Sequence, residues 1–171
     1  MKKISIIIST ILFLSLLMVG CDVNDESSCP SDLSGELSTT ESDFVGTWAL
    51  TDMVSAEEVD LTDDNMNNPS TNIFPQLPEC QQDVVYEFKI DRTFSIKQAY
   101  NVAGCQNKGI VEGTWKLSGG QLTLVALCTS QVYNVDINTE NTLFTLEDRY
   151  KFNDVLGVVI TSDATLTYER M

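Results

Sequence analysis

The sequence predicts an all-β fold, an eight-stranded antiparallel up-and-down barrel, from three observations. Apolar and polar residues alternate along short segments such as residues 84–90, and this period of two is typical of a strand with one buried face. Turn residues such as Gly119 and Gly120 separate these segments. No segment after residue 43 has a convincing helical period. Since closing eight strands removes both sheet edges, we expect a barrel, with an open sandwich of the same strands as the alternative.

The expected strands follow one another at regular spacing along the chain. A long acidic loop over residues 57–78 interrupts the series after the first strand. Four strands then form a meander between residues 80 and 127, and Gly119 and Gly120 join the last two of them. The remaining segments lie before and after this meander, at residues 44–53, 131–137, 143–152 and 155–170.

The first 20 residues predict a lipoprotein signal peptide. Two lysines precede an apolar run over residues 4–19, and Gly20 and Cys21 follow, as in secretory signals. The run is shorter than the roughly 20 residues of a transmembrane helix. Residues 17–21 resemble the bacterial lipobox, and this resemblance implies acylation of Cys21, which anchors a protein stably. An ordinary signal peptide with an incidental cysteine is the alternative.

The mature chain is expected to have two parts. Residues 21–43 are polar and without pattern, which predicts a lipidated flexible tether, and residues 44–171 form the barrel domain. The formal net charge of the chain is −15. A chain this acidic is not expected to bind nucleic acid, because that affinity comes largely from neutralising phosphates. Anionic lipids repel it as well, so membrane attachment is expected through the lipid anchor only.

Short motifs along residues 44–170 resemble those of the lipocalin-like lipoproteins of Bacteroidetes. This resemblance implies a lipocalin-like barrel on an outer-membrane lipoprotein, displayed on the periplasmic or the cell-surface face. It further implies that Trp48 closes the barrel floor with Arg170 packed on it; the alternative is a core tryptophan and a solvated arginine. The chain has Arg92 where this family tends to have a turn glycine. The motifs are Gly46-Thr47-Trp48, Gly113-Thr114-Trp115, Thr167-Tyr168-Glu169-Arg170, and Cys80, Asp83, Phe88, Thr93, Phe94 and Cys105 between them.

Four cysteines remain after the lipidated one, and they allow three pairings. Disulfides are favoured because an exported chain sits in an oxidising compartment. A hairpin that turns at residues 91–92 brings Cys80 and Cys105 to its open end, which predicts this bridge. Cys29 and Cys128 pair by elimination only, and an unpaired state of both is the alternative. No two cysteines have metal-ligand spacing and the chain has no histidine, which argues against zinc.

The sequence does not predict an enzyme, and no cofactor is expected. Without histidine the chain lacks the commonest general base. It has no nucleophile elbow, phosphate-binding loop or dinucleotide fingerprint. A glycosidase would need two facing carboxylates. Asp148 is the one acid named for this role, because it shares a strand face with Phe144 and Tyr150; a strand that has reached the barrel mouth is the plainer interpretation.

Asp60, Thr62 and Asp64 form a weak candidate for a calcium site. Their alternate spacing imitates the start of a calcium loop, and Asn65 can take the left-handed turn. The twelfth position is Thr71 rather than glutamate. A solvated acidic loop is therefore the simpler interpretation, and no metal is assigned.

Two functions fit the predicted barrel. An eight-stranded barrel either packs solid or holds one small ligand, so the first hypothesis is a protein that binds a small apolar ligand in the barrel. Because large rings can fill such a barrel, the second is an interaction module whose loops, chiefly residues 57–78, bind an envelope protein or a glycan. The aromatic residues expected to line the interior are Trp48, Tyr86, Phe88, Phe94, Trp115 and Phe144. The aliphatic ones are Leu50, Ile96, Leu122, Leu124, Val135 and Leu146.

Overall fold

The structure, a computed structural model, describes residues 28–171. The expected signal peptide over residues 1–20 and the acylated Cys21 lie outside the described residues. No helix within residues 28–171 is long and apolar enough to cross a membrane. The elements are, in chain order, α1 (Thr39–Phe44), β1 (Gly46–Val59), β2 (Ser70–Asn72), η1 (Phe74–Gln76), α2 (Glu79–Gln82), β3 (Val84–Phe88), β4 (Thr93–Gln98), β5 (Gly109–Ser118), β6 (Gln121–Ala126), β7 (Thr129–Ile137), β8 (Leu143–Asn153) and β9 (Val159–Arg170).

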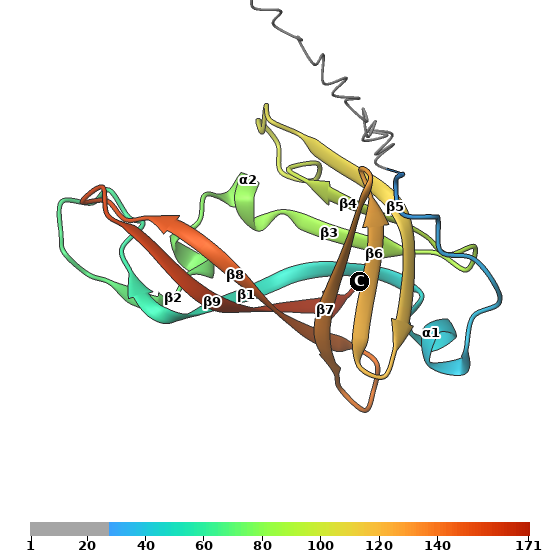
Figure 1. Cartoon of the computed structure of the whole chain (residues 1–171). Helices are drawn as coiled ribbons and strands as arrows, with labels where there is room; N and C mark the ends of the chain where they lie inside the picture. Colours follow the sequence, from blue (N-terminus) through green and yellow to red (C-terminus); the bar gives the residue numbers. More distant parts are fainter. Residues whose placement is uncertain (1–27) are drawn as a thin grey trace, which may run out of the picture.

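Eight of these strands close into an antiparallel up-and-down barrel, as the sequence predicts (Figure 1). Strands β3 to β9 pair in chain order, and β1 pairs with both β3 and β9. The register along the closing pair runs from Trp48 opposite Arg170 to Ser55 opposite Ala164. The open-sandwich alternative is wrong, because this pairing leaves no free edge among the eight strands.

The segment between β1 and β3 is more regular than the loop that the sequence predicts over residues 57–78. Strand β1 continues beyond residue 53 and ends at Val59. Its pairing with β9 extends as far as Ser55. The buried hydroxyls of Ser55 and Ser162 join these two strands at 2.8 Å. Strand β2 then pairs antiparallel with β1 as a short ninth strand outside the barrel, and η1 and α2 follow. The sequence pattern does not reveal this extension, because the buried Ser55 and Ser162 are polar and form a hydrogen bond with each other instead of facing solvent.

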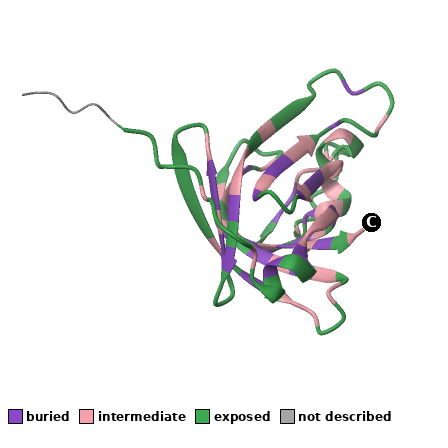
Figure 2. Cartoon of the chain, turned by 90° about the vertical axis from the view of Figure 1, so that its right-hand side faces the viewer, coloured by how far each residue is buried: buried purple, intermediate pink, exposed green. Residues whose placement is uncertain are grey.

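The connections alternate between two ends of the barrel. The turns after β3, β5 and β7 lie at the end that α1 covers, which we call the closed end. The turns after β4, β6 and β8, and the connection from β1 to β3, lie at the opposite, open end. Figure 2 shows the buried residues within the strands and the exposed ones in the turns and along parts of the strands.

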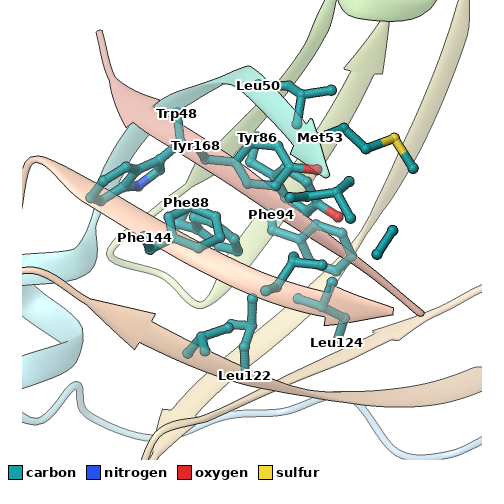
Figure 3. Close-up of a cluster of buried hydrophobic side chains, with 14 of the residues drawn as sticks. Trp48, Leu50, Met53, Tyr86, Phe88, Phe94, Leu122, Leu124, Phe144 and Tyr168 are labelled. Carbon is teal, nitrogen blue, oxygen red and sulfur yellow. The ribbon is translucent and has the colours of Figure 1, made fainter. Parts of the chain in front are cut away.

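Aromatic rings pack the closed end solid. Phe44, the last residue of α1, is 1% exposed, and its ring centroid lies 4.9–5.9 Å from four other rings, those of Trp48, Phe88, Trp115 and Phe144. Figure 3 shows the rings of Trp48, Phe88 and Phe144 in this packing. The Trp48 indole N–H donates to the Phe44 carbonyl oxygen at 3.1 Å, so the polar edge of the ring is satisfied within the core. Each fully buried ring of this size stabilises the fold by about 1.5–3 kcal/mol.

Arg170 covers the outer face of this cluster. Its guanidinium carbon lies 4.2 Å from the centroid of the Trp48 ring. Its nitrogens donate to the carbonyl oxygens of Asn141, Val45 and Asp43 at 2.6–2.8 Å. The packing of Arg170 on Trp48 that the family resemblance implies is confirmed, and the solvated arginine is wrong.

Residues 28–43 differ from the expected flexible tether, because they are docked on the barrel. The Leu33 N–H donates to the Thr114 hydroxyl at 2.8 Å, and Cys29 is bonded to Cys128 at the turn after β6. Ser38 begins α1 with a capping box in which its side chain and that of Glu41 accept from each other's backbone N–H. Hydrogen bonds and a disulfide hold this segment, so its sequence carries no apolar period.

Glu41 and Arg92 form a buried ion pair that fastens α1 to the closed end. The two Arg92 Nη atoms lie 2.7 and 3.0 Å from the two carboxylate oxygens, and both side chains are about 5% exposed or less. The guanidinium also donates to the carbonyl oxygens of Gly35, Glu36 and Trp115. Arg92 takes a left-handed φ of 65°, which costs a non-glycine residue about 1–2 kcal/mol. Its five hydrogen bonds explain why arginine is tolerated at this turn.

Both predicted disulfides are present. Cys80, on α2, is bonded to Cys105 in the connection between β4 and β5, as the hairpin geometry predicts. Cys29 is bonded to Cys128, so the pairing reached by elimination is confirmed and the unpaired alternative is wrong. The two bridges tie two different segments, the β1–β3 connection and the N-terminal segment, to turns at the open end.

Candidate functional site

The candidate site is a cavity of about 370 Å³ at the open end of the barrel. Its wall is formed by side chains from β1, β9 and β8, among them Leu50, Met53 and Leu166. Gln98, at the end of β4, and Gln81, on α2, add amide groups to the lining. The disulfide from Cys80 to Cys105 holds α2 beside this mouth, because it ties the helix to the connection that follows β4. The site is therefore a hollow whose lining combines apolar side chains with hydroxyl and amide groups.

Two tyrosines separate this cavity from the packed closed end. The rings of Tyr86 and Tyr168 meet edge to face with centroids 5.1 Å apart. On their other side Tyr86 stacks on Phe88 at 5.5 Å and Tyr168 stacks on Phe144 at 4.8 Å. Figure 3 shows the hydroxyl groups of the tyrosines on the side of Met53, away from Trp48. The floor of the cavity thus presents phenol hydroxyls above a solid aromatic layer.

The tyrosines of the cavity are neutral near pH 7. Burial raises the pKa of Tyr86 and of Tyr168. Burial, with a smaller effect of the Asp148 carboxylate, raises the pKa of Tyr150 to about 12. Outside the cavity lining, burial and Asp148 likewise raise the pKa of Tyr133. Neutral phenols donate and accept hydrogen bonds but do not act as bases, so these groups are suited to orienting a ligand.

The structure divides the six aromatic residues expected to line the interior into two groups. Tyr86 alone lines the cavity. The other five are at most 2% exposed and belong to the packed core: Trp48, Phe88, Phe94, Trp115 and Phe144. Of the aliphatic set, Leu50 lines the cavity, Ile96 is half-buried, and the remaining four are buried in the core: Leu122, Leu124, Val135 and Leu146.

Sequence reasoning missed several residues that the structure brings to the cavity. Leu166 and Tyr168 alternate with Ala164 along β9, so the period of two could have placed them on the inner face. Met53 lies in β1 beyond a break in the register between Leu50 and Asp52, and this break hides its orientation. Gln81 had no signal in the sequence, because α2 is a four-residue helix within a connection.

Asp148 is half-buried on β8, opposite Ala164. Its carboxylate accepts a hydrogen bond from the N–H of Arg149, the next residue, at 2.7 Å. It lies near enough to Tyr133 and Tyr150 to raise their pKa values. The acid named for glycosidase chemistry thus lies near Tyr150, which lines the cavity, and near Tyr133, which does not.

The carboxylates of the calcium candidates Asp60 and Asp64 accept hydrogen bonds from other residues of their own loop. Asp60 is 1% exposed, and its carboxylate accepts from the Thr62 N–H and hydroxyl and from the Asn68 N–H at 2.9–3.1 Å. These bonds, chiefly the one from Asn68, lower the pKa of Asp60. Asp64 accepts from the Met66 N–H and from the Asn68 side chain. Across residues 28–171 no three or more acidic or cysteine side chains gather as metal ligands.

A family model described as "Domain of unknown function (DUF5004)" matches residues 22–170. The chain belongs to this family. No curated protein matches the chain. The DUF5004 match begins before the barrel and so includes the docked segment and α1, which the structure shows as part of the domain. An eight-stranded barrel with this DUF5004 match fits a lipocalin-like fold.

Proposed function

We propose that this protein is a non-enzymatic binding protein that holds a small apolar ligand in the cavity at the open end of its barrel. The observation that carries the proposal is the difference between the two ends. One is filled by rings around Phe44, and the other has a hollow of about 370 Å³. Small-molecule sites in proteins are concave, largely apolar and about 300–1,000 Å³ in volume. This hollow lies at the lower end of that range, so the ligand is small.

The lining suggests a ligand with one polar group. Leu50, Met53 and Leu166 offer apolar contacts, whereas the hydroxyls of the tyrosines and the amides of Gln81 and Gln98 offer hydrogen bonds. A buried polar group on the ligand would need such a partner, because an unpaired one costs roughly 1–3 kcal/mol. A fatty acid or another small amphiphile has this combination of groups.

The same proposal places the protein on the outer membrane as a lipoprotein related to those of Bacteroidetes. Its support is the signal-like segment over residues 1–20 and the lipobox resemblance that ends at Cys21. Acylation would anchor the mature chain on the periplasmic or the cell-surface face. No nucleic-acid partner is proposed, given the net charge of −15.

A ligand in the cavity is expected to raise the unfolding midpoint. A ligand at a concentration 100 times its dissociation constant adds about 2.7 kcal/mol to the free energy of unfolding. This raises the midpoint by several degrees in a domain of this size. The measurement is a thermal shift of the purified mature chain against fatty acids and other small apolar compounds, with native mass spectrometry for any compound that co-purifies. The variant Val84→Trp, which places an indole at the half-buried Val84 of the cavity wall, is expected to abolish the shift.

The matched control for this experiment is Val132→Trp, because Val132 is an exposed valine outside the cavity. It should keep the full shift. A shift that survives in Val84→Trp would contradict the proposed site, and the absence of any shift or co-purified compound would contradict the proposed ligand.

The alternative function is an envelope interaction module that binds a protein or a glycan through its loops. One observation favours it: Asp60 is buried and hydrogen-bonded to Thr62 and Asn68, so the loop over residues 57–78 presents a built surface rather than a loose one. If no apolar compound binds, a pull-down from envelope extracts with the full chain and with Asp60→Ala tests this alternative. It predicts a partner that the variant loses.

A further inference from the structure

Exposed apolar side chains lie in two separate turns of the open end. The turn after β8 and the first residue of β9 form a run of five residues without charge, residues 155–159, in which Leu156 is 76% exposed. Val158 and Val159 beside it are 55% and 59% exposed. Leu127, in the turn after β6, is 78% exposed. Exposed apolar residues clustered at one end of a domain mark a surface that contacts another molecule or a membrane.

The docked N-terminal segment ends at the same place. Cys29 is bonded to Cys128, the residue after Leu127, so the first described residues are fixed at the turn after β6 (Figure 1). Eight residue steps separate Cys29 from Cys21, and they span at most about 28 Å when fully extended. An anchor at Cys21 therefore holds the open end near the lipid, whereas α1 and the closed end lie on the far side of the barrel.

We infer that the open end of the barrel rests on the lipid surface, with the apolar turns in contact with the bilayer and the cavity opening toward it. This inference rests on the proposed lipid anchor and names where the ligand enters: an amphiphile would pass between the bilayer and the cavity without crossing water. The lipid in contact is zwitterionic, because a chain with a net charge of −15 is repelled by anionic head groups. Apolar side chains at such an interface insert among the head groups.

Tryptophan reporters at the two ends test the orientation. The acylated mature chain is reconstituted in phosphatidylcholine vesicles that contain phosphatidylcholine with brominated acyl chains, which quench nearby indoles. Leu156→Trp places a reporter at the open end, and Ile90→Trp places one in the turn after β3, at the closed end. Leu156 and Ile90 are 76% and 78% exposed, so the two variants are matched. The native Trp48 and Trp115 are fully buried and give a constant background that the parent chain measures.

The expected result is a blue-shifted and strongly quenched reporter in Leu156→Trp and an unquenched one in Ile90→Trp. Leu156 is the discriminating position because it lies on a different hairpin from the one that carries Cys128. Two results would overturn the orientation but not the anchor, provided that the protein floats with the vesicles. They are equal quenching at both positions and the absence of quenching in Leu156→Trp. Protein that does not float would overturn both. The thermal shift with apolar compounds decides the proposed ligand separately, because it needs no vesicle.

Discussion

Replacing Glu41 with alanine is expected to lower the free energy of unfolding by about 3–5 kcal/mol, because it leaves the Arg92 guanidinium buried without its carboxylate. Both oxygens of Glu41 are used in the native state, one of them accepting from the Leu117 N–H as well as from Arg92. Urea unfolding of oxidised protein comprising residues 22–171 measures the change. The control is Asp163→Ala, which breaks the exposed pair with Arg149 and is expected to leave the midpoint nearly unchanged.

The pH dependence of the same variant provides the second arm of this test. The hydrogen bond from Arg92, aided by those from the N–H groups of Ser38 and Leu117, lowers the pKa of Glu41 from 4.5 to about 2. A carboxylate with a lowered folded-state pKa stabilises the fold fully above about pH 4.5 and loses that contribution as the pH falls toward 2. The difference in the free energy of unfolding between the parent chain and Glu41→Ala should therefore become smaller as the pH falls from 5 to 3. A difference in the free energy of unfolding that is small at pH 7, or that does not change with pH, would contradict this account of the closed end.

Removing the bridge between Cys29 and Cys128 is expected to cost about 4.7 kcal/mol in the chain-entropy model, since the two cysteines are 99 residues apart. The double variant Cys29→Ser/Cys128→Ser avoids a free thiol. The bridge between Cys80 and Cys105 spans 25 residues, for which the same model gives about 3.5 kcal/mol. Urea unfolding of the two double variants compares the losses, and the larger loss is expected for Cys29→Ser/Cys128→Ser. The reverse order would show that the N-terminal segment is a weakly held appendage rather than part of the domain.

The barrel could be predicted from the sequence because the signals for its strands and turns lie within short stretches of neighbouring residues. Tyr86 and Phe88 in β3 and Phe94 in β4 stand at alternating positions and belong to the core, and turn residues mark where the chain reverses. The extension of β1 could not be predicted, because its buried partners Ser55 and Ser162 are polar and satisfy each other across 107 residues. The docking of residues 28–43 was hidden for the same reason: Glu41 is a charged residue whose burial makes sense only once Arg92 faces it.

The candidate site was predicted only in part. Inner-face residues can be listed from alternation, but alternation does not say at which height in the barrel a hollow begins. That boundary depends on Phe44, which enters the barrel from α1 and fills the closed end with the rings of Trp48 and Phe144. The open end lacks such a plug, so the hollow begins above Tyr86 and Tyr168.

Methyl groups of methionine provide the most direct test of the claim that the open-end cavity binds a small apolar ligand. Residues 22–171 contain three methionines: Met53 lines the cavity, whereas Met66 and Met171 are exposed and do not line it. In a chain labelled with carbon-13 at these methyls, a fatty acid that shifts the unfolding midpoint is titrated to saturation. The account predicts that the Met53 resonance moves while those of Met66 and Met171 stay in place. A Met53 resonance that does not move at saturation would contradict it.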